Sequence, residues 1–271
     1  MAIVDSARIG HADTTVGLFG SRHAIRVSRF LPRVCCFHMH GGVSVNHLRR
    51  AFLAVLCGAV LVVGPQTPAS AITGGTTTSS LHGQVQIWNN GGANFRCTGS
   101  LIHVHYVLTA AHCLHSSRLV VKAGDKRLGS GQRIIVDGTA AAPKGYDMAV
   151  LHLASNVTQS NLVVPYSRDT ALLKTGVTVA IRGWGQTETN GPPASTLRVC
   201  SLRVERSIAS ELELEGLDGV PLDGDSGAAV WQNNRVQAVF THSDDALGGL
   251  SVPTGFLAGW IKSVSGVDGI D

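Results

Sequence analysis

Short apolar runs separated by turn residues recur through about the last 200 residues, and they constrain the fold more than any other feature. Many are rich in β-branched residues and have Gly, Asn, Asp or Ser near their ends, which is typical of β-strands. Their spacing favours an all-β barrel or sandwich. Only segment 256–264 has a convincing helical pattern. The expected strands are 85–88, 101–104, 119–121, 133–136, 148–153, 177–181, 197–204, 228–231 and 236–240.

The segment 39–71 has a different character. Arg49-Arg50 precede an apolar run at 51–65, and a short polar stretch follows that ends in Ala69-Ser70-Ala71. This order of charge, apolar run and small residues predicts a secretory signal peptide. The run of 15 residues is short for a bilayer span of roughly 20. Both the twin-arginine and the general secretory route are compatible with the two arginines.

Residues 1–38 precede Met39, are rich in Arg and His, and show no clear periodicity. We expect them to be a translation-start artefact, because Met39 would begin a signal peptide of ordinary length; the alternative is a disordered extension. Residues 1–71 hold 7 Lys+Arg against 2 Asp+Glu, and the remainder holds 15 against 16. The overall charge of +4 therefore comes from the leader, and nothing in the rest indicates a nucleic acid or an anionic membrane as partner.

The stretch DGDSG at 223–227 contains a candidate nucleophile. The glycines around Ser226 allow a tight turn that exposes its hydroxyl. They also leave the backbone N–H groups of Gly224 and Ser226 free to point at one oxygen. A serine hydroxyl becomes a good nucleophile only when a base takes its proton. The sequence therefore needs a base elsewhere in the chain.

His112, in the motif LTAAHC, is the candidate base, and Asp147, in the motif DMAVL, is the carboxylate that would orient it. Seven histidines follow residue 71, and only the surrounding motif distinguishes His112. The competing carboxylate is Asp125, which we expect on a loop. Asp147 directly precedes an expected strand.

From Ile72 onward, over about 200 of the 271 residues, the chain resembles the trypsin/chymotrypsin family of secreted serine proteases. The order His, Asp, Ser is also the order in chymotrypsin. The resemblance is carried by Ile72-Thr73-Gly74-Gly75, CTGSLI at 97–102, LTAAHC at 108–113, DMAVL at 147–151, Gly183-Trp184-Gly185, GDSG at 224–227 and Trp260-Ile261-Lys262.

The resemblance implies an all-β domain at 72–271, with two six-stranded antiparallel barrels, a C-terminal helix and an active site in the cleft between the barrels. His112 and Asp147 would come from the first barrel and Ser226 from the second. The implied function is a secreted, extracellular serine endopeptidase that hydrolyses peptide bonds through an acyl-enzyme. It would act on protein or peptide substrates as a monomer, without metal, cofactor or lasting membrane association.

The resemblance also assigns supporting roles. The N–H groups of Gly224 and Ser226 would form the oxyanion hole. Asp225 would pair with the α-amine of Ile72, which signal-peptide cleavage after Ala71 would create. Ile72 lies 40 residues before His112, close to the spacing in the family.

Cys97 and Cys113 occupy the positions of the family's disulfide beside the catalytic histidine. A disulfide there suits an oxidising compartment. Cys200 then has no partner, and it is either a buried free thiol or an intermolecular link.

The expected specificity pocket departs from the family pattern. Val220 stands where trypsins carry an aspartate, so we expect no strong preference for Lys or Arg at P1. Leu222 replaces a disulfide cysteine. The substrate-binding segment is Thr241-His242-Ser243, in which His242 either favours an acidic P1 side chain or packs over the cleft.

No convincing metal site is expected, because His103 and His105 would share one strand face without a third ligand. Two other functions remain open. They are a secreted, non-catalytic binding protein on a protease scaffold and an esterase that uses the same triad.

Overall fold

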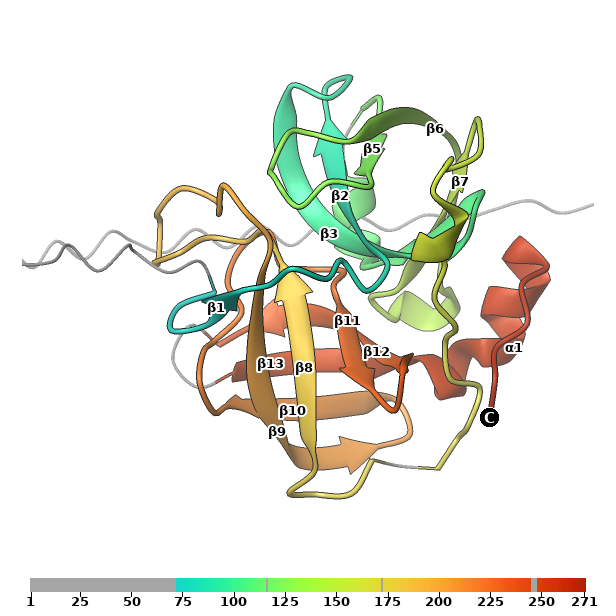
Figure 1. The fold of residues 1–271 in the computed structure, drawn as a ribbon. Helices are drawn as coiled ribbons and strands as arrows, with labels where there is room; N and C mark the ends of the chain where they lie inside the picture. The colour runs from blue at the N-terminus through green and yellow to red at the C-terminus, as the bar shows by residue number, and fades with distance from the viewer. Residues whose placement is uncertain (1–71, 116, 172, 245–247) are drawn as a thin grey trace, which may run out of the picture. The chain divides into compact units, whose positions relative to one another are not determined.

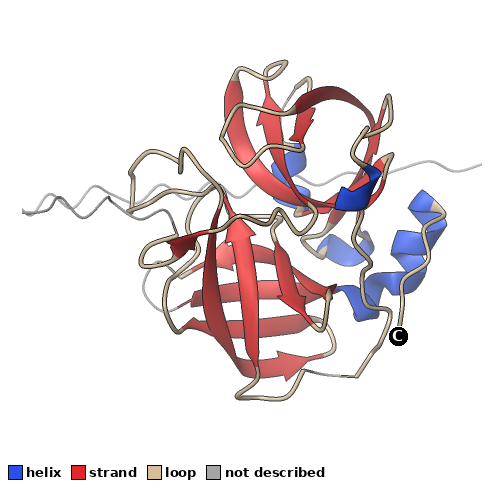
Figure 2. Ribbon diagram, viewed as in Figure 1, coloured by secondary structure: helices blue, strands red, loops and turns tan. Residues whose placement is uncertain are grey.

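The computed structural model describes residues 72–271 except 116, 172 and 245–247, all within the compact unit Gly64–Asp271. The expected signal peptide at 39–71 and the segment 1–38 lie outside the described residues. Within the described part, strands dominate, with one longer helix near the C-terminus (Figures 1 and 2). No helix in that part is long and apolar enough to span a membrane.

Six antiparallel strands close the first barrel in the order β2-β3-β4-β7-β6-β5, and β5 pairs back to β2 (Figure 1). β-branched and aromatic residues suit such strands because they pack well on a pleated, half-buried surface. Closure leaves no free sheet edge. The strands are β2 (Gln84–Asn89), β3 (Asn94–His103), β4 (Tyr106–Thr109), β5 (Val120–Ala123), β6 (Gln132–Ala141) and β7 (Ala149–Leu153).

The second barrel has the ring order β8-β9-β10-β13-β12-β11, and β11 pairs back to β8. A two-residue strand, β1 (Thr76–Thr77), pairs with the start of β9 outside this ring. The ring strands are β8 (Thr178–Gly183), β9 (Arg198–Ile208), β10 (Glu211–Gly216), β11 (Ala229–Gln232), β12 (Arg235–Ser243) and β13 (Gly248–Pro253).

The helix α1 (Thr254–Ser265) follows β13 directly, and its buried Leu257 and Ile261 join an apolar cluster that contains the core of the first barrel together with Val236 and Val239 of β12. It ends at Gly266, whose φ of 70° lies in the left-handed region and lets its N–H bond to the carbonyl of Lys262. The described part of the chain also contains three single-turn 3₁₀ helices: η1 (Ala111–Leu114), η2 (Pro143–Gly145) and η3 (Ser160–Leu162).

The expectation of two six-stranded antiparallel barrels with a C-terminal helix is confirmed. Each expected strand overlaps an observed one, and 256–264 lies inside α1. The barrel strands β4, β10 and β13 and the short β1 were not expected. In β10 the leucines are buried and the glutamates face outward, so period-two burial prevails over the helix propensity of Glu and Leu.

Cys200 lies on β9 with 1 % of its surface exposed and forms no disulfide among the described residues. Burial raises the pKa of its thiol well above the usual value. Both observations agree with a buried, unreactive free thiol.

Candidate active site

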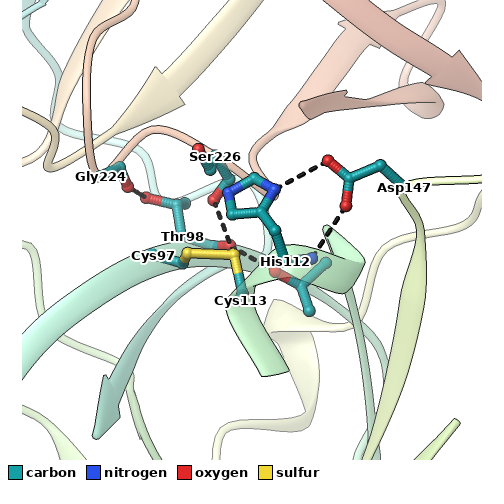
Figure 3. Close-up of a disulfide and its surroundings, with 8 residues drawn as sticks. Cys97, Thr98, His112, Cys113, Asp147, Gly224 and Ser226 are labelled. Atoms are coloured by element: carbon teal, nitrogen blue, oxygen red, sulfur yellow. Dashed lines mark hydrogen bonds and ion pairs between the residues drawn. A yellow bond between two sulfur atoms is a disulfide. The ribbon is translucent and has the colours of Figure 1, made fainter. Parts of the chain in front are cut away.

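His112 lies in η1, just after β4 ends at Thr109. The next residue, Cys113, forms the expected disulfide with Cys97 of β3 (Figure 3). Both cysteines are buried. In the chain-entropy model, a disulfide that closes a loop of this length stabilises by about 3 kcal/mol. The backbone beside His112 is therefore fixed to the barrel wall.

Asp147 lies between η2 and the start of β7. Because β4 and β7 pair antiparallel, with Thr109 opposite Ala149, the end of β4 and the start of β7 meet at the same edge of the barrel. The neighbouring Tyr146 packs edge-on against Phe256 of α1, with ring centroids 5.0 Å apart. Strand pairing and this aromatic contact together place Asp147 beside His112.

Two hydrogen bonds join Asp147 to His112. The backbone N–H of His112 donates to Oδ1 at 2.9 Å, and the ring Nδ1 lies 2.7 Å from Oδ2 (Figure 3). Burial raises the pKa of Asp147, but the hydrogen bonds and charge of His112 outweigh burial, so the pKa is lowered. An ionised carboxylate can only accept, so Nδ1 carries the proton and Nε2 keeps its lone pair.

The competing carboxylate, Asp125, has a different partner. Its Oδ2 lies 3.0 Å from Nη2 of Arg127, and its Oδ1 accepts the backbone N–H of Arg127 at 2.8 Å. These contacts close a turn between β5 and β6.

Ser226 lies in the turn that precedes β11, and both barrels hold this turn. Its carbonyl oxygen accepts the N–H of Thr98 on β3 at 3.0 Å. The N–H of Gly227 donates to the carbonyl of Phe240 on β12 at 2.7 Å. Figure 3 shows the imidazole of His112 between Asp147 and Ser226. His112 and Ser226 also line the same two cavities.

The backbone of Gly224 and Ser226 has two features that suit anion binding. Among the described residues, neither N–H donates to a protein acceptor. Gly224 has a φ of 97°, and a Cβ there would lie 2.8 Å from the ring of Phe95. Its carbonyl is fixed in turn by the hydroxyl of Thr98, at 2.9 Å (Figure 3). The turn therefore requires glycine and leaves two donors free.

The two cavities at Ser226 have volumes of about 320 Å³ and 470 Å³. The larger one has buried walls from Leu222 and Phe240, whereas the charged side chains that line it are exposed. These charged or titratable side chains are Asp223, His242 and Asp244, besides His112 itself. A cavity of about 750 Å³ elsewhere, lined by His82 and Trp231, lacks both His112 and Ser226.

The segment Thr241-His242-Ser243 lines the larger cavity at the end of β12. β13 pairs with β12 up to Ser243, whereas β11 pairs with it only up to Val239. Among the described strands, β11 therefore does not extend along the other edge of this segment. Val220, expected at the base of the pocket, is not among the residues that line this cavity, and its N–H bonds to the carbonyl of Thr73 at 2.9 Å.

Asp225 is fully buried. Its oxygens accept the N–H groups of Gly185 at 2.8 Å and Leu222 at 3.0 Å. No cationic side chain of the described residues lies within ion-pair distance. Burial raises its pKa to about 7, because these two hydrogen bonds compensate only in part.

Ile72 is also fully buried and packs in the core of the second barrel with Cys200. The charge of Asp225 contributes to the raised pKa of Cys200, so Asp225 lies in the same region of the second barrel as Cys200 and Ile72. Ile72 has a φ of 46°, which is unfavourable for a β-branched residue. This torsion includes the carbonyl carbon of residue 71, so it disappears if the chain is cut before Ile72.

Sequence reasoning did not find every residue that shapes this site. Thr98 bonds to both the Ser226 and the Gly224 backbone, and Tyr146 braces the loop of Asp147. Thr98 follows Cys97 in the CTGSLI motif, and this proximity was the only available signal.

Comparison with known proteins places the chain in a family. The sequence model described as Trypsin matches residues 72–258. The chain is 29 % identical to Trypsin alpha-4 of Lucilia cuprina over 172 residues, 56 % of this chain and 67 % of that protein. It is 35 % identical to Chymotrypsin-like elastase family member 1 of Homo sapiens over 156 residues, 49 % of this chain and 59 % of that protein.

A third relative, Trypsin II-P29 of Gallus gallus, is 29 % identical over 213 residues, 69 % of this chain and 85 % of that protein. The family match covers both barrels and the turn that contains Ser226. The chain therefore belongs to the trypsin/chymotrypsin-like serine protease family.

Proposed function

We propose that this chain is a secreted serine endopeptidase that hydrolyses peptide bonds through an acyl-enzyme. The observation that carries the proposal is the pair of hydrogen bonds that His112 donates to Asp147, with His112 and Ser226 lining one cavity. Family membership supports the same reaction class. No step of this chemistry requires a metal or cofactor.

In the proposed mechanism, the hydroxyl of Ser226 attacks the carbonyl carbon of the scissile bond while Nε2 of His112 takes its proton. His112 then gives this proton to the leaving amine, and an acyl-enzyme remains. Water attacks the ester by the same route in reverse. Asp147 holds the imidazole in the Nδ1–H form and stabilises the imidazolium.

The N–H groups of Gly224 and Ser226 would hold the negative oxygen of each tetrahedral intermediate. Their lack of protein acceptors among the described residues supports this role. Removing one such donor typically costs about 3–4 kcal/mol of transition-state stabilisation.

We propose further that export removes the leader after Ala71 and leaves Ile72 as the N-terminus. The new α-amine would be the cation that Asp225 lacks, and the pair would fix the turn 223–227. The buried side chain of Ile72 and its positive φ support this step, because cleavage removes the strain while the side chain stays packed.

The larger cavity supports a neutral P1 side chain. Its buried walls are Leu222 and Phe240, and the carboxylates of Asp223 and Asp244 are exposed. Exposed carboxylates attract a Lys or Arg side chain only weakly, whereas they repel an acidic one. Cleavage of a mixed peptide library should therefore show no strong preference for basic or acidic P1 residues; products ending mainly in Lys and Arg, or in Asp and Glu, would refute this.

A fluorophosphonate probe tests the proposed nucleophile. It should label the secreted protein at Ser226 and leave the Ser226→Ala variant unlabelled, with hydrolysis reduced by about 10⁶-fold and the fold unchanged. An unlabelled parent protein that binds peptides without cleaving them would favour the binding-protein alternative. Hydrolysis of ester but not amide substrates would favour the esterase alternative.

A further inference from the structure

Three histidines and a tyrosine gather on the first barrel, where the turn after β3 meets the end of β7. The ring centroids of His103 and His105 are 6.1 Å apart, and those of His105 and His152 are 5.6 Å apart. Tyr106 packs edge-on against His152 at 5.1 Å. The proposed mechanism uses none of these side chains.

His152 is held in one orientation. Its Nδ1 lies 2.5 Å from Oδ1 of Asp137 on β6, and about 40 % of its side chain is exposed. The carboxylate accepts the Nδ1 proton, so Nε2 keeps a lone pair. A carboxylate that orients a histidine in this way is the usual outer partner of a metal ligand.

The distance between His105 and His152 suits a shared ion. Two imidazoles on one tetrahedral zinc ion, with Zn–N bonds of about 2 Å, have ring centroids roughly 5 Å apart. The observed 5.6 Å requires only a small adjustment of two partly exposed rings. In His103, by contrast, Nδ1 accepts the backbone N–H of His105 at 3.2 Å. The proton of the neutral His103 ring is then on Nε2, so neither ring nitrogen has a lone pair available for a metal.

We propose that His105 and His152 form a surface site for a transition-metal ion such as zinc, with Asp137 as the positioning residue and water completing the coordination. The described residues contain one group of three potential ligands whose atoms all lie within 4.8 Å of one another, namely Cys97, His112 and Cys113. The two sulfurs of that group are bonded to each other, so it lacks the thiolates that zinc would need.

The zinc site would connect β4 and β7, the paired strands that lead to the proposed catalytic residues His112 and Asp147. β4 begins beside His105 and leads to His112, and β7 begins after Asp147 and contains His152 near its end. The ion would thus tie together the end of this strand pair that lies away from the catalytic residues. Its expected effect is a more stable barrel without a direct role in catalysis.

Calorimetric titration with zinc chloride tests the proposal on the protein that cells secrete when they express the full chain. The titration uses the His112→Ala background, so that zinc bound at the catalytic histidine does not contribute. We expect one zinc ion per molecule and a higher melting temperature with zinc. His105→Asn and His152→Gln should each weaken binding at least tenfold, and Asp137→Ala about tenfold.

His115→Asn, an exposed histidine of the same barrel, is the matched control and should leave zinc affinity unchanged. Melting curves without zinc check that each variant folds. The proposal is overturned if the His112→Ala protein binds no zinc. It is equally overturned if folded His105→Asn and His152→Gln variants bind zinc as tightly as that parent.

Discussion

Two carboxylates beside Ser226 and His112 have pKa values that shift in opposite directions: Asp147, whose side chain is 32 % exposed, and Asp225, which is fully buried. Asp147 is bonded to the ring and backbone of His112, and its pKa is lowered despite burial. Asp225 is bonded only to backbone N–H groups, and burial raises its pKa to about 7. The difference lies in the partner: a group that can become a cation faces Asp147, whereas no cationic side chain of the described residues pairs with Asp225.

In our proposal, His112 and Asp147 of the first barrel are already paired before the leader is removed, whereas Asp225 of the second barrel gains a cationic partner only when Ile72 becomes the N-terminus. Neutralising a buried carboxylate by protonation and pairing it with an amine are alternative solutions to the same desolvation cost. In our proposal, Asp225 of the uncut chain is protonated, whereas Asp225 of the chain that begins at Ile72 is ionised and paired with the α-amine.

Of the changes that test this comparison of the two carboxylates, removing the charge of Asp147 should have the largest effect. Asp147→Asn should lower kcat by about 10⁴-fold at neutral pH, because an amide no longer enforces the Nδ1–H tautomer of His112. Measuring kcat with a peptide substrate and recording melting curves would separate a loss of catalysis from a loss of folding. Asp125→Asn is the matched control and should lose little activity, since Asp125 pairs with Arg127.

Asp225→Asn should act with opposite sign in the two forms of the protein. In the cleaved form it leaves the buried α-amine unpaired, which typically costs about 3–5 kcal/mol and should reduce activity by roughly 10²–10³-fold. In a form that keeps Ala71 before Ile72, it should stabilise the fold at pH 8, because no carboxylate is then ionised in the core. Urea unfolding of both forms measures this. Equal losses of stability in the two forms would contradict the comparison.

A smaller effect concerns pH. Because Asp225 has a raised pKa in the uncleaved folded protein, its contribution to the free energy of unfolding is fully present below about pH 4. This contribution is lost as the pH rises through about 7. The lowered pKa of Asp147 gives stability above about pH 4 that is lost as pH falls further. Unfolding of the Ala71-containing form at pH 5 and pH 8 should therefore show lower stability at pH 8, and Asp225→Asn should remove this difference. A pH-independent parent would refute the assignment.

The sequence was sufficient for the parts of the fold that have a strong local signal. Runs rich in β-branched residues predicted most strands, and the apolar spacing of 256–264 predicted α1. It was insufficient for β10, whose Glu and Leu residues form a strand because β9 and β13 pair with its two edges and its leucines pack in the barrel core. The same holds for the glycine-rich β13.

The candidate site shows a similar division. Motifs located the candidate triad residues and the disulfide, because each lies in a distinctive local sequence. The contact of Tyr146 with Phe256, the two bonds from Thr98 and the position of Val220 outside the cavity depend on segments far apart in the chain. The missing cation at Asp225 also depends on the assembled barrel, and no local pattern reveals it.

The most direct test of the account is the N-terminus of the molecules that react at Ser226. Secreted protein would be labelled with a fluorophosphonate and its intact mass measured, with the Ser226→Ala protein as control. We predict that the labelled molecules begin at Ile72 and that a form with Ala71 retained labels weakly. Full labelling of molecules that begin at Ala71 or earlier would contradict the claim that the new amine at Ile72 completes the site.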